Sequence, residues 1–493
     1  MKTLEKRKGQ EQMGKNIKFG TDGWRAIIAE DFTFDNVEIV TKAVAGYIKT
    51  KYNPSCPVII GYDTRFLADK FAQKAAQTLN KLGINAKITN SDAPTPVVAY
   101  SAKHLNSAGA LMFTASHNPP EYCGIKYIPD YAGPATTDIT DVIVENVKKI
   151  QQGDESFLPE VTPPGTTDEF DPKPDYFKLV QELIDFEKIK QANIKIFFDP
   201  LYASGKGYFD TLLKEAGCDV TSIKNWRDPL YGGAMPEPRE KFLGDLKKLV
   251  LENPSSVGFS NDGDADRFGV IDEKGTYITP NEVIAVLFKH LIKNRGAVGS
   301  VVKTVATSQM IDKIAKLYNV KVHETPVGFK WIGRIMRQED VIIGGEESGG
   351  LSIIGHIPEK DGIVANLLIL EAMAYEQKPL HKIVEELKQE IGVYYINYRL
   401  DLHLTEEIKN AAMDIFLNKP PEKVGSVGVS RINKLDGVKF YFDDDNSWIL
   451  IRPSGTEPLL RIYFETDSND KLTTMVEDIK DLIENLSMSG QAG

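Results

Sequence analysis

The sequence lacks the features of several large protein classes. Among its 493 residues only three are cysteines, Cys56, Cys123 and Cys218, and no two of them are close along the chain. Neither a disulfide framework nor a thiolate zinc site is supported, and a reduced cytosol fits best. No segment stays apolar for the roughly 20 residues that a membrane helix needs. The first 18 residues are polar and lysine-rich. We therefore expect a cytoplasmic protein with no membrane partner, whose residues 1–18 form a flexible leader.

An excess of positive charge is also missing. Lysine and arginine number 59 against 70 aspartate and glutamate residues, which gives a net charge of −11. This balance disfavours broad contact with nucleic acid, so no such partner is expected and any bound phosphate must be held by local donors. The hydrophobic fraction of 42% is that of an ordinary globular chain. At about 150 residues per domain, the length predicts three or four domains.

Common nucleotide-binding and zinc-protease motifs are absent. The sequence has no Gly-x4-Gly-Lys-Ser/Thr, and the nearest approach to a dinucleotide fingerprint, Gly-Lys-Gly at residues 205–207, has Asp210 in place of the third glycine. His323-Glu324 lacks the second histidine that the helical zinc-protease motif requires at position 327. Nucleotide-driven kinases, Rossmann dehydrogenases and that class of protease are therefore disfavoured.

Short apolar runs alternate with longer amphipathic stretches, which is typical of an α/β fold. The expected strands lie at residues 58–60, 110–113, 194–198, 257–259, 341–343 and 449–451, and the expected helices at 68–82, 208–215, 282–293 and 363–375. A proline-rich stretch at 151–173 is predicted to be a linker, with softer boundaries at Pro280 and at 389–393. These boundaries predict domains at residues 19–172, 173–279, 280–390 and 391–493.

One apolar run is followed by a loop that contains a serine and two prolines. Residues 114–120 read Thr-Ala-Ser-His-Asn-Pro-Pro, and the prolines end the strand and fix the backbone. Ser116 and His117 should therefore sit on a rigid loop, where a serine hydroxyl can be a nucleophile or a phosphate carrier. A polar turn is the alternative. Lys126, ten residues beyond Ser116, is a proton donor or acceptor if it lies nearby, although taken alone a solvated lysine is the simpler interpretation.

Three aspartates follow another apolar run at alternate positions. Residues 262–267 read Asp-Gly-Asp-Ala-Asp-Arg, and such carboxylates can converge on one hard cation such as Mg²⁺. An EF-hand loop counted from Asp262 has the required glutamate at its twelfth position, Glu273, but has Arg267 instead of glycine at its sixth. A solvated acidic turn is the other alternative. It is disfavoured because clustered carboxylates repel one another unless something neutralises them.

Two further regions combine groups suited to sugars and phosphates. Residues 344–350 read Gly-Gly-Glu-Glu-Ser-Gly-Gly, and 356–362 read His-Ile-Pro-Glu-Lys-Asp-Gly. Carboxylates and hydroxyls on a glycine-rich loop suit sugar hydroxyls, but the same residues also make ordinary loops. Residues 452–458 read Arg-Pro-Ser-Gly-Thr-Glu-Pro, with Arg461 beyond. They offer a guanidinium, hydroxyls and backbone N–H groups to a phosphate; a structural hairpin is the alternative.

Taken in order along the chain, these loops resemble the α-D-phosphohexomutase superfamily. The resemblance includes Phe-Gly-Thr-Asp-Gly-Trp-Arg at residues 19–25 and extends from about residue 19 to 464. Residues 346–348, 356–362 and the Thr-Pro-Val-Gly-Phe-Lys segment at 325–330 are most similar to the phosphoglucomutases of this superfamily. Glucosamine-phosphate mutases usually have Gln at position 347 and His at position 350, and the dual glucose/mannose enzymes often share that His.

The resemblance implies a heart-shaped, four-domain α/β protein. Three similar α/β domains and a smaller, mobile α+β C-terminal domain would surround a central cleft. It implies that Ser116 carries a phosphoryl group and that Ser116, Asp262, Asp264 and Asp266 hold Mg²⁺. The other implied site residues are, for catalysis, His117, Lys126 and Arg267 and, for substrate binding, Arg25, Gly328, Glu346, Ser348, Lys360, Arg452, Ser454, Gly455, Thr456 and Arg461. Cys123 departs from the Asn that relatives often carry, which puts the hydrogen bonding beside Lys126 in question.

The implied activity is the reversible interconversion of glucose 1-phosphate and glucose 6-phosphate. Glucose 1,6-bisphosphate would be both intermediate and activator, and the partner is a hexose phosphate. The alternative is a phosphomannomutase or a dual-specificity phosphohexomutase. Transfer from Ser116 to water would instead make a phosphatase, and a chain that binds without turnover would be a sugar-phosphate-binding regulator.

Overall fold

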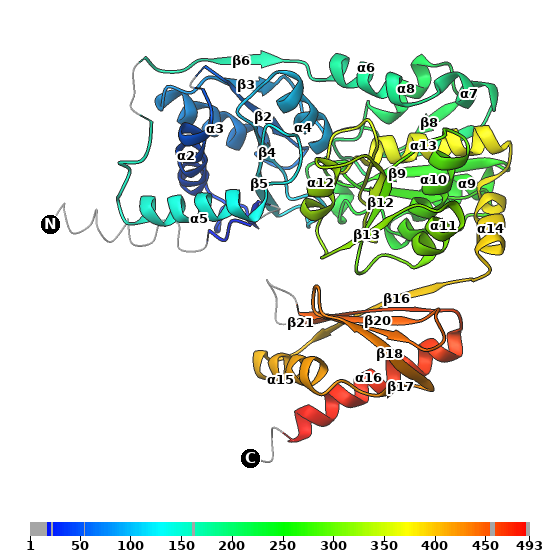
Figure 1. Cartoon of the computed structure of the whole chain (residues 1–493). Coiled ribbons are helices and arrows are strands. Elements are labelled where there is room, and N and C mark those ends of the chain that lie inside the picture. Colours follow the sequence, from blue (N-terminus) through cyan, green and yellow to red (C-terminus); the bar gives the residue numbers. More distant parts are fainter. Residues whose placement is uncertain (1–16, 21–22, 54, 160–162, 454–458, 490–493) are drawn as a thin grey trace.

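Four sheets organise the chain, and helices cover each of them (Figure 1). The computed structural model describes residues 17–20, 23–53, 55–159, 163–453 and 459–489. The first three sheets combine parallel and antiparallel strands, whereas the fourth is antiparallel throughout. The α/β class predicted from the alternating pattern is confirmed, with an α+β domain at the C-terminal end.

The first sheet has six strands in the order β1-β5-β4-β2-β3-β6. They are β1 (Trp24–Ile27), β2 (Val58–Tyr62), β3 (Ala86–Thr89), β4 (Ala110–Phe113), β5 (Tyr122–Ile128) and β6 (Thr167–Phe170), with helices α2 (Phe34–Lys51), α3 (Ala68–Lys81), α4 (Thr95–His104) and α5 (Thr137–Gln151). Successive residues of β2 point to opposite faces. Val58 and Ile60 join the core formed with α2, α3 and α5, and Ile59 packs with α4.

The predicted linker contains a strand that the sequence did not indicate. Residues 167–170 form β6, which pairs in parallel with β3 so that Thr167 lies opposite Ala86. The first three residues of β6 are exposed. An edge strand of this kind is held by its backbone and needs no apolar alternation, which is why the pattern missed it.

The second and third sheets share one continuous core. The second sheet, in the order β11-β10-β9-β7-β8, comprises β7 (Lys195–Asp199), β8 (Val220–Ser222), β9 (Ser256–Asn261), β10 (Phe268–Ile271) and β11 (Tyr277–Ile278), with α6 (Lys173–Leu183), α7 (Phe186–Gln191), α8 (Phe209–Glu215) and α9 (Gly244–Glu252) and the short helices η1 (Tyr231–Gly233) and η2 (Glu240–Phe242). The third sheet, in the order β13-β12-β14-β15, comprises β12 (Ser300–Thr304), β13 (Val322–Thr325), β14 (Val341–Gly345) and β15 (Leu351–Ile353), with α10 (Pro280–Lys293), α11 (Met310–Tyr318), α12 (Phe329–Met336), α13 (Gly362–Glu376) and α14 (Leu380–Ile391).

Helix α13 explains why these two units pack as one. It has no continuous polar face, and all of its residues from Gly362 to Ala374, the polar Asn366 and Glu371 included, are buried. A helix without a polar face must be covered all round, and α13 contacts strands of both sheets together with α7 and α10. Helix α10 begins at Pro280, two residues before the predicted start, because the side chain of Thr279 and that of Glu282 form a capping box at its first turn.

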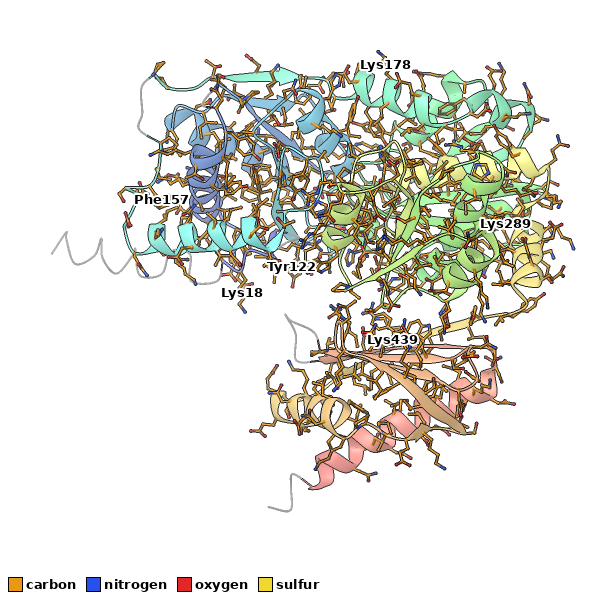
Figure 2. All side chains as sticks on the ribbon, viewed as in Figure 1. Lys18, Tyr122, Phe157, Lys178, Lys289 and Lys439 are labelled. Carbon is orange, nitrogen blue, oxygen red and sulfur yellow. The ribbon has the colours of Figure 1, made fainter. Side chains whose placement is uncertain are left out.

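The fourth sheet has the order β16-β21-β20-β19-β18-β17. Its elements are β16 (Ile396–His403), β17 (Lys423–Val424), β18 (Val427–Asn433), β19 (Val438–Phe442), β20 (Trp448–Pro453) and β21 (Leu459–Thr466), with α15 (Glu406–Asn418) and α16 (Asn469–Ser489). Both helices pack on one face. The other face is turned toward the third sheet and carries Lys439 (Figure 2), and there Trp448 and Tyr463 pack against Val305 and Ala306.

The helices of the described part of the chain do not have the dimensions and composition that a bilayer requires. None of them is both long and apolar enough to cross a membrane.

Candidate active site

The serine, aspartate and glycine-rich loops occupy equivalent places in the first three sheets. Each loop joins a strand with a parallel neighbour to the next, antiparallel strand: β4 to β5, β9 to β10, and β14 to β15. The residues involved are 114–121, 262–267 and 346–350. One topological position, repeated three times, therefore supplies three of the four loops that the sequence singled out.

Ser116 lies at the point where the first two of these loops meet. Its side chain is buried, and Oγ donates a 2.8 Å hydrogen bond to Oδ2 of Asp262. Nδ1 of His117 lies 3.3 Å from the same Oγ. The backbone N–H of Ser116 donates to Oγ1 of Thr114 at 2.8 Å, and the φ of Ser116 is 49°, in the left-handed region. The expected rigid presentation of the serine is therefore observed, with a strained backbone at the serine itself.

Asp262, Asp264 and Asp266 converge as their alternate spacing predicted. Each offers an oxygen within 4.8 Å of the others, and none is more than 1% exposed. Oδ1 of Asp264 and Oδ1 of Asp266 have no hydrogen-bond partner among the described residues. Buried carboxylate oxygens are costly without a partner, and Mg²⁺ binds such hard oxygen donors. The donor set fits a divalent cation, and neither a solvated turn nor an EF-hand between helices describes this buried turn between two strands.

Lys126 and Lys360 bring positive charge to the triad. Nζ of Lys126 lies 2.7 Å from Oδ2 of Asp264, and Nζ of Lys360 lies 2.8 Å from Oδ2 of Asp266. Each lysine is only 9% exposed. The interpretation of Lys126 as a solvated lysine is therefore wrong: strand β5 turns its side chain inward, and the carboxylates compensate the cost of burying an ammonium group.

Burial raises the pKa of all three aspartates, and the same two lysines reverse this effect at Asp264 and Asp266. Burial, with the charges of Asp266 and Asp264, holds the pKa of Asp262 well above its usual range. Burial also raises the pKa of Asp264, but Lys126 outweighs it and the net pKa is lowered. Burial and the charge of Asp264 also raise the pKa of Asp266, but Lys360 and Lys126 outweigh them and the net pKa is lowered. Two ionised carboxylates thus remain at the centre of the site.

His117 is held in its neutral form by its surroundings. The charge of Arg267 is the largest cause, and burial and Arg25 add to it, so that the pKa of His117 lies well below its usual value. Arg267 itself follows the triad and lies 3.9 Å from Oδ1 of Asp266. A neutral imidazole beside the serine hydroxyl can exchange a proton with it.

Arg25 reaches the serine loop from β1. Its Nη1 donates to Oδ1 of Asn118 at 2.8 Å. Cys123 does not disturb this region, because its side chain packs in the core of the first domain with Phe113 and Ile125, on the face of β5 opposite to Lys126.

The glycine-rich loop presents Glu346 and Ser348 in different ways. Oε1 of Glu346 accepts a 3.0 Å hydrogen bond from the backbone N–H of Gly328, which precedes α12. Ser348 lines a cavity of about 480 Å³ together with Arg267 and Glu347. Residues of the second, third and fourth domains all contribute to its wall. The cavity therefore lies between Ser348 and the C-terminal domain, although neither Arg452 nor Arg461 is part of its wall.

The predicted phosphate loop is only partly within the described residues. Ser454, Gly455 and Thr456 lie outside them. Arg452 and Arg461 lie opposite each other on β20 and β21. Nε of Arg452 donates at 3.1 Å to Oδ2 of Asp436, which also accepts from the backbone N–H of Val327 at 2.9 Å.

Sequence reasoning missed two residues of this site, Arg65 and Asp436. Arg65 is completely buried and donates to three carbonyls of the serine loop, among them that of Ser116 at 2.7 Å, and to the carbonyl of Tyr122 at the start of β5. Its only sequence signal is a Tyr-Asp-Thr-Arg segment at the end of an apolar run, residues 62–65. Asp436 stands in a Leu-Asp-Gly turn, which by itself indicates only a hairpin.

Sequence profiles of known families match this architecture piece by piece. The profiles of the phosphoglucomutase/phosphomannomutase family match in order: alpha/beta/alpha domain I at residues 16–154, domain II at 174–275, domain III at 279–391 and the C-terminal domain at 411–482. Four such domains with these loops define an α-D-phosphohexomutase, an isomerase. The chain belongs to the phosphoglucomutase/phosphomannomutase family.

Individual relatives cover nearly the whole chain. A phosphoglucomutase/phosphomannomutase of Thermococcus kodakarensis is 30% identical over 94% of this chain and 97% of its own length. A phosphoglucosamine mutase of Methanococcus maripaludis is 31% identical over 84% and 88% of the two chains. The crystal structure of a protein from Thermus thermophilus, described as a phosphomannomutase, superposes with a TM-score of 0.83 at 30% identity over 95% and 99%. These relatives differ in their named substrates.

Proposed function

We propose that this phosphohexomutase is a phosphoglucomutase. It interconverts glucose 1-phosphate and glucose 6-phosphate through a phosphoserine at Ser116 and through glucose 1,6-bisphosphate. The observation that carries the proposal is the meeting of Ser116 with the aspartate triad, where Oγ lies 2.8 Å from Asp262. A phosphoryl group on that oxygen would lie against the same carboxylates.

The chemistry requires positioning and positive charge more than a strong base. Asp262, Asp264 and Asp266 would hold Mg²⁺, which when bound supplies positive charge to the phosphoryl oxygens. Arg267 and Lys126 contribute positive charge of their own. The pKa of Lys126 is raised because Asp264 and Asp266 outweigh its burial, so it stays an ammonium group.

Proton movement is assigned to His117. When phosphoserine reacts with glucose 1-phosphate, the bond between phosphorus and Oγ of Ser116 breaks and a bond to O6 of the sugar forms. The proton of the 6-hydroxyl must end on Oγ. A neutral imidazole with Nδ1 at 3.3 Å from Oγ can accept the proton of the 6-hydroxyl and release a proton to Oγ. The second half of the reaction is the reverse, with the 1-phosphate returning to Ser116 after the bisphosphate has turned over in the cleft.

The phosphate that does not react is assigned to the C-terminal domain. Arg452, Ser454, Gly455, Thr456 and Arg461 would bind it, since guanidinium groups match phosphate oxygens in pairs. A phosphate-binding site on a separate domain can hold either phosphate of the bisphosphate while the other phosphate lies at Ser116. Glu346 and Ser348 would bind sugar hydroxyls between the two ends.

The preference for glucose is supported by the space around Gly350. A Cβ atom at this position would approach Cδ of Lys360 to 2.4 Å. The histidine that glucosamine-phosphate mutases usually carry here would displace Lys360, and with it the 2.8 Å ion pair to Asp266. Glu347, where those enzymes usually have glutamine, accepts a hydrogen bond from Oγ1 of Thr304 at 3.2 Å.

The relatives named phosphomannomutase and phosphoglucosamine mutase make those activities the second candidates. A coupled assay of the purified protein with the 1-phosphates of glucose, mannose and glucosamine in parallel tests the choice. The largest kcat/KM is expected for glucose 1-phosphate. A larger value for either other sugar contradicts the glucose assignment, and release of inorganic phosphate without isomerised sugar would identify a phosphatase.

A further inference from the structure

Arg65 lies three residues after the end of β2 and uses every N–H of its guanidinium to bind the serine loop, the first residue of β5 and one carboxylate. A guanidinium carries five N–H groups, and the structure shows five hydrogen bonds from this one. Nε donates to Oδ2 of Asp63 at 3.2 Å. The other four bonds end on backbone carbonyls: those of Ser116 and Asn118 at 2.7 Å each, Pro119 at 2.7 Å and Tyr122 at 2.9 Å.

The serine loop needs such an anchor. Ser116 has a φ of 49°, and a backbone strained in this way persists only where its surroundings over-determine it. The aspartate loop packs directly against the carbonyl oxygen of Ser116, since an added Cβ at Gly263 would lie 2.2 Å from that oxygen. The oxygen that Arg65 holds is thus the contact point of the two loops.

The second domain closes over the same arginine. The ring of Tyr231, a buried residue of that domain, lies 5.2 Å from the guanidinium carbon of Arg65. Arg227 donates to the carbonyls of Thr64 at 3.3 Å and Arg65 at 3.4 Å. Residues of the second domain, which carries the triad, therefore hold Arg65 in place. Arg65 in turn holds the serine loop of the first domain.

From these contacts we infer that Arg65 is the positioning residue of the phosphoryl-transfer step, an inference that rests on the proposed function. Its guanidinium binds the loop backbone and makes no hydrogen bond to the Ser116 side chain. It sets the direction of Oγ toward Asp262 and leaves substrate binding to other loops. A lysine cannot replace it, because an ammonium has three donors for five acceptors.

Arg65→Lys tests this inference while it keeps the charge. We expect kcat to fall about 100-fold, as a displacement near 1 Å can produce, with KM nearly unchanged because the sugar and phosphate loops are not touched. The matched control is Arg295→Lys, since Arg295 is a partly buried arginine that binds Glu371 and the carbonyl of Leu183, in no contact with the serine loop. The control should lose thermal stability and keep kcat.

The decisive readout is the single-turnover rate of phosphoryl transfer from the isolated phosphoenzyme to glucose 1-phosphate, followed by intact mass. A folded Arg65→Lys variant that transfers at the wild-type rate overturns the inference. If Arg65→Lys does not fold, Tyr231→Leu takes its place, with an expected fall of about tenfold; a wild-type rate there overturns the inference equally. Wild-type protein without turnover on any hexose 1-phosphate refutes the proposed function and this inference together, whereas an active wild type with an unimpaired variant refutes the inference alone.

Discussion

The Oγ atom of Ser116 and the Oδ2 atom of Asp262 are joined by a 2.8 Å hydrogen bond across 146 residues of chain. The two loops can approach this closely because the residue after Asp262 is a glycine. At Gly263 a Cβ would meet the carbonyl oxygen of Ser116 at 2.2 Å, a separation that non-bonded atoms do not reach. The meeting of the serine with the metal-binding candidates therefore depends on a missing side chain.

Gly263→Ala should separate the two loops. Because the obstructing atoms are backbone, the serine has to move, and we expect kcat to fall about 100-fold with a loss of stability of about 1–3 kcal/mol. Steady-state kinetics and thermal unfolding measure both effects. Gly244→Ala is the control, since a Cβ there meets nothing within 4 Å; a Gly263→Ala variant as active as this control would contradict the close contact.

Asp266→Asn should weaken metal binding. Asp266 offers an Oδ1 with no hydrogen-bond partner among the described residues, and removing its charge is expected to raise the Mg²⁺ concentration for half-maximal activity by about tenfold or more. Calorimetric titration with Mg²⁺ gives the same comparison without turnover. Asp199→Asn, at a buried aspartate paired with Lys224, should leave the Mg²⁺ dependence unchanged. Equal dependence in both variants would remove Asp266 from the metal site.

Asp436→Asn should loosen the phosphate grip. Asp436 accepts hydrogen bonds from Nε of Arg452 and from the backbone N–H of Val327. It therefore orients the guanidinium of Arg452 while it leaves the two terminal nitrogens of that guanidinium available for a phosphate. We expect the KM for the hexose phosphate to rise about tenfold with a smaller change in kcat, since a charged hydrogen bond contributes about 1.5–3 kcal/mol. Asp445→Asn, an exposed position of the same domain, serves as control. An unchanged KM would show that Arg452 needs no such partner.

Lys439 should make the stability depend on pH in the alkaline range. It is fully buried against Glu324 at 3.1 Å, and burial, with Lys303, lowers its pKa to about 8. The folded-state pKa lies below the unfolded value of about 10.4, so its stabilisation is present above that value and is lost as pH falls through 8. Relative to Lys439→Met, the wild type should gain up to about 3 kcal/mol between pH 8 and 10.4. A stability difference that stays constant across this window in denaturant unfolding contradicts the prediction.

The strands and helices were predictable where burial follows a regular pattern. The runs at 58–60, 110–113 and 257–259 became β2, β4 and β9 because both faces of these strands are covered, which demands continuous apolar sequence. Strand β6 was not predicted, because an edge strand with exposed side chains shows no continuous apolar run in the sequence.

The site was predictable to the extent that its groups lie close together in sequence. The spacing of Asp262, Asp264 and Asp266 at every second position is enough to predict that they share a ligand. The meeting of Ser116 with Asp262 does not follow from spacing, and the family resemblance supplied it. Arg65 was missed for a different reason, which also left Lys126 ambiguous until the family resemblance was considered. A single basic residue in a strand or turn has the same sequence signature whether it is solvated or buried, and only tertiary packing decides between the two.

The most direct test of the account follows phosphate on Ser116 itself. The protein is incubated with glucose 1,6-bisphosphate, separated from it, and mixed with glucose 1-phosphate while peptide and intact mass are recorded over time. The account predicts one phosphoryl group on Ser116, lost to the sugar at least as fast as steady-state turnover and never present in Ser116→Ala, which should be inactive. Turnover without phosphate on Ser116, or near-normal turnover by Ser116→Ala, would contradict it.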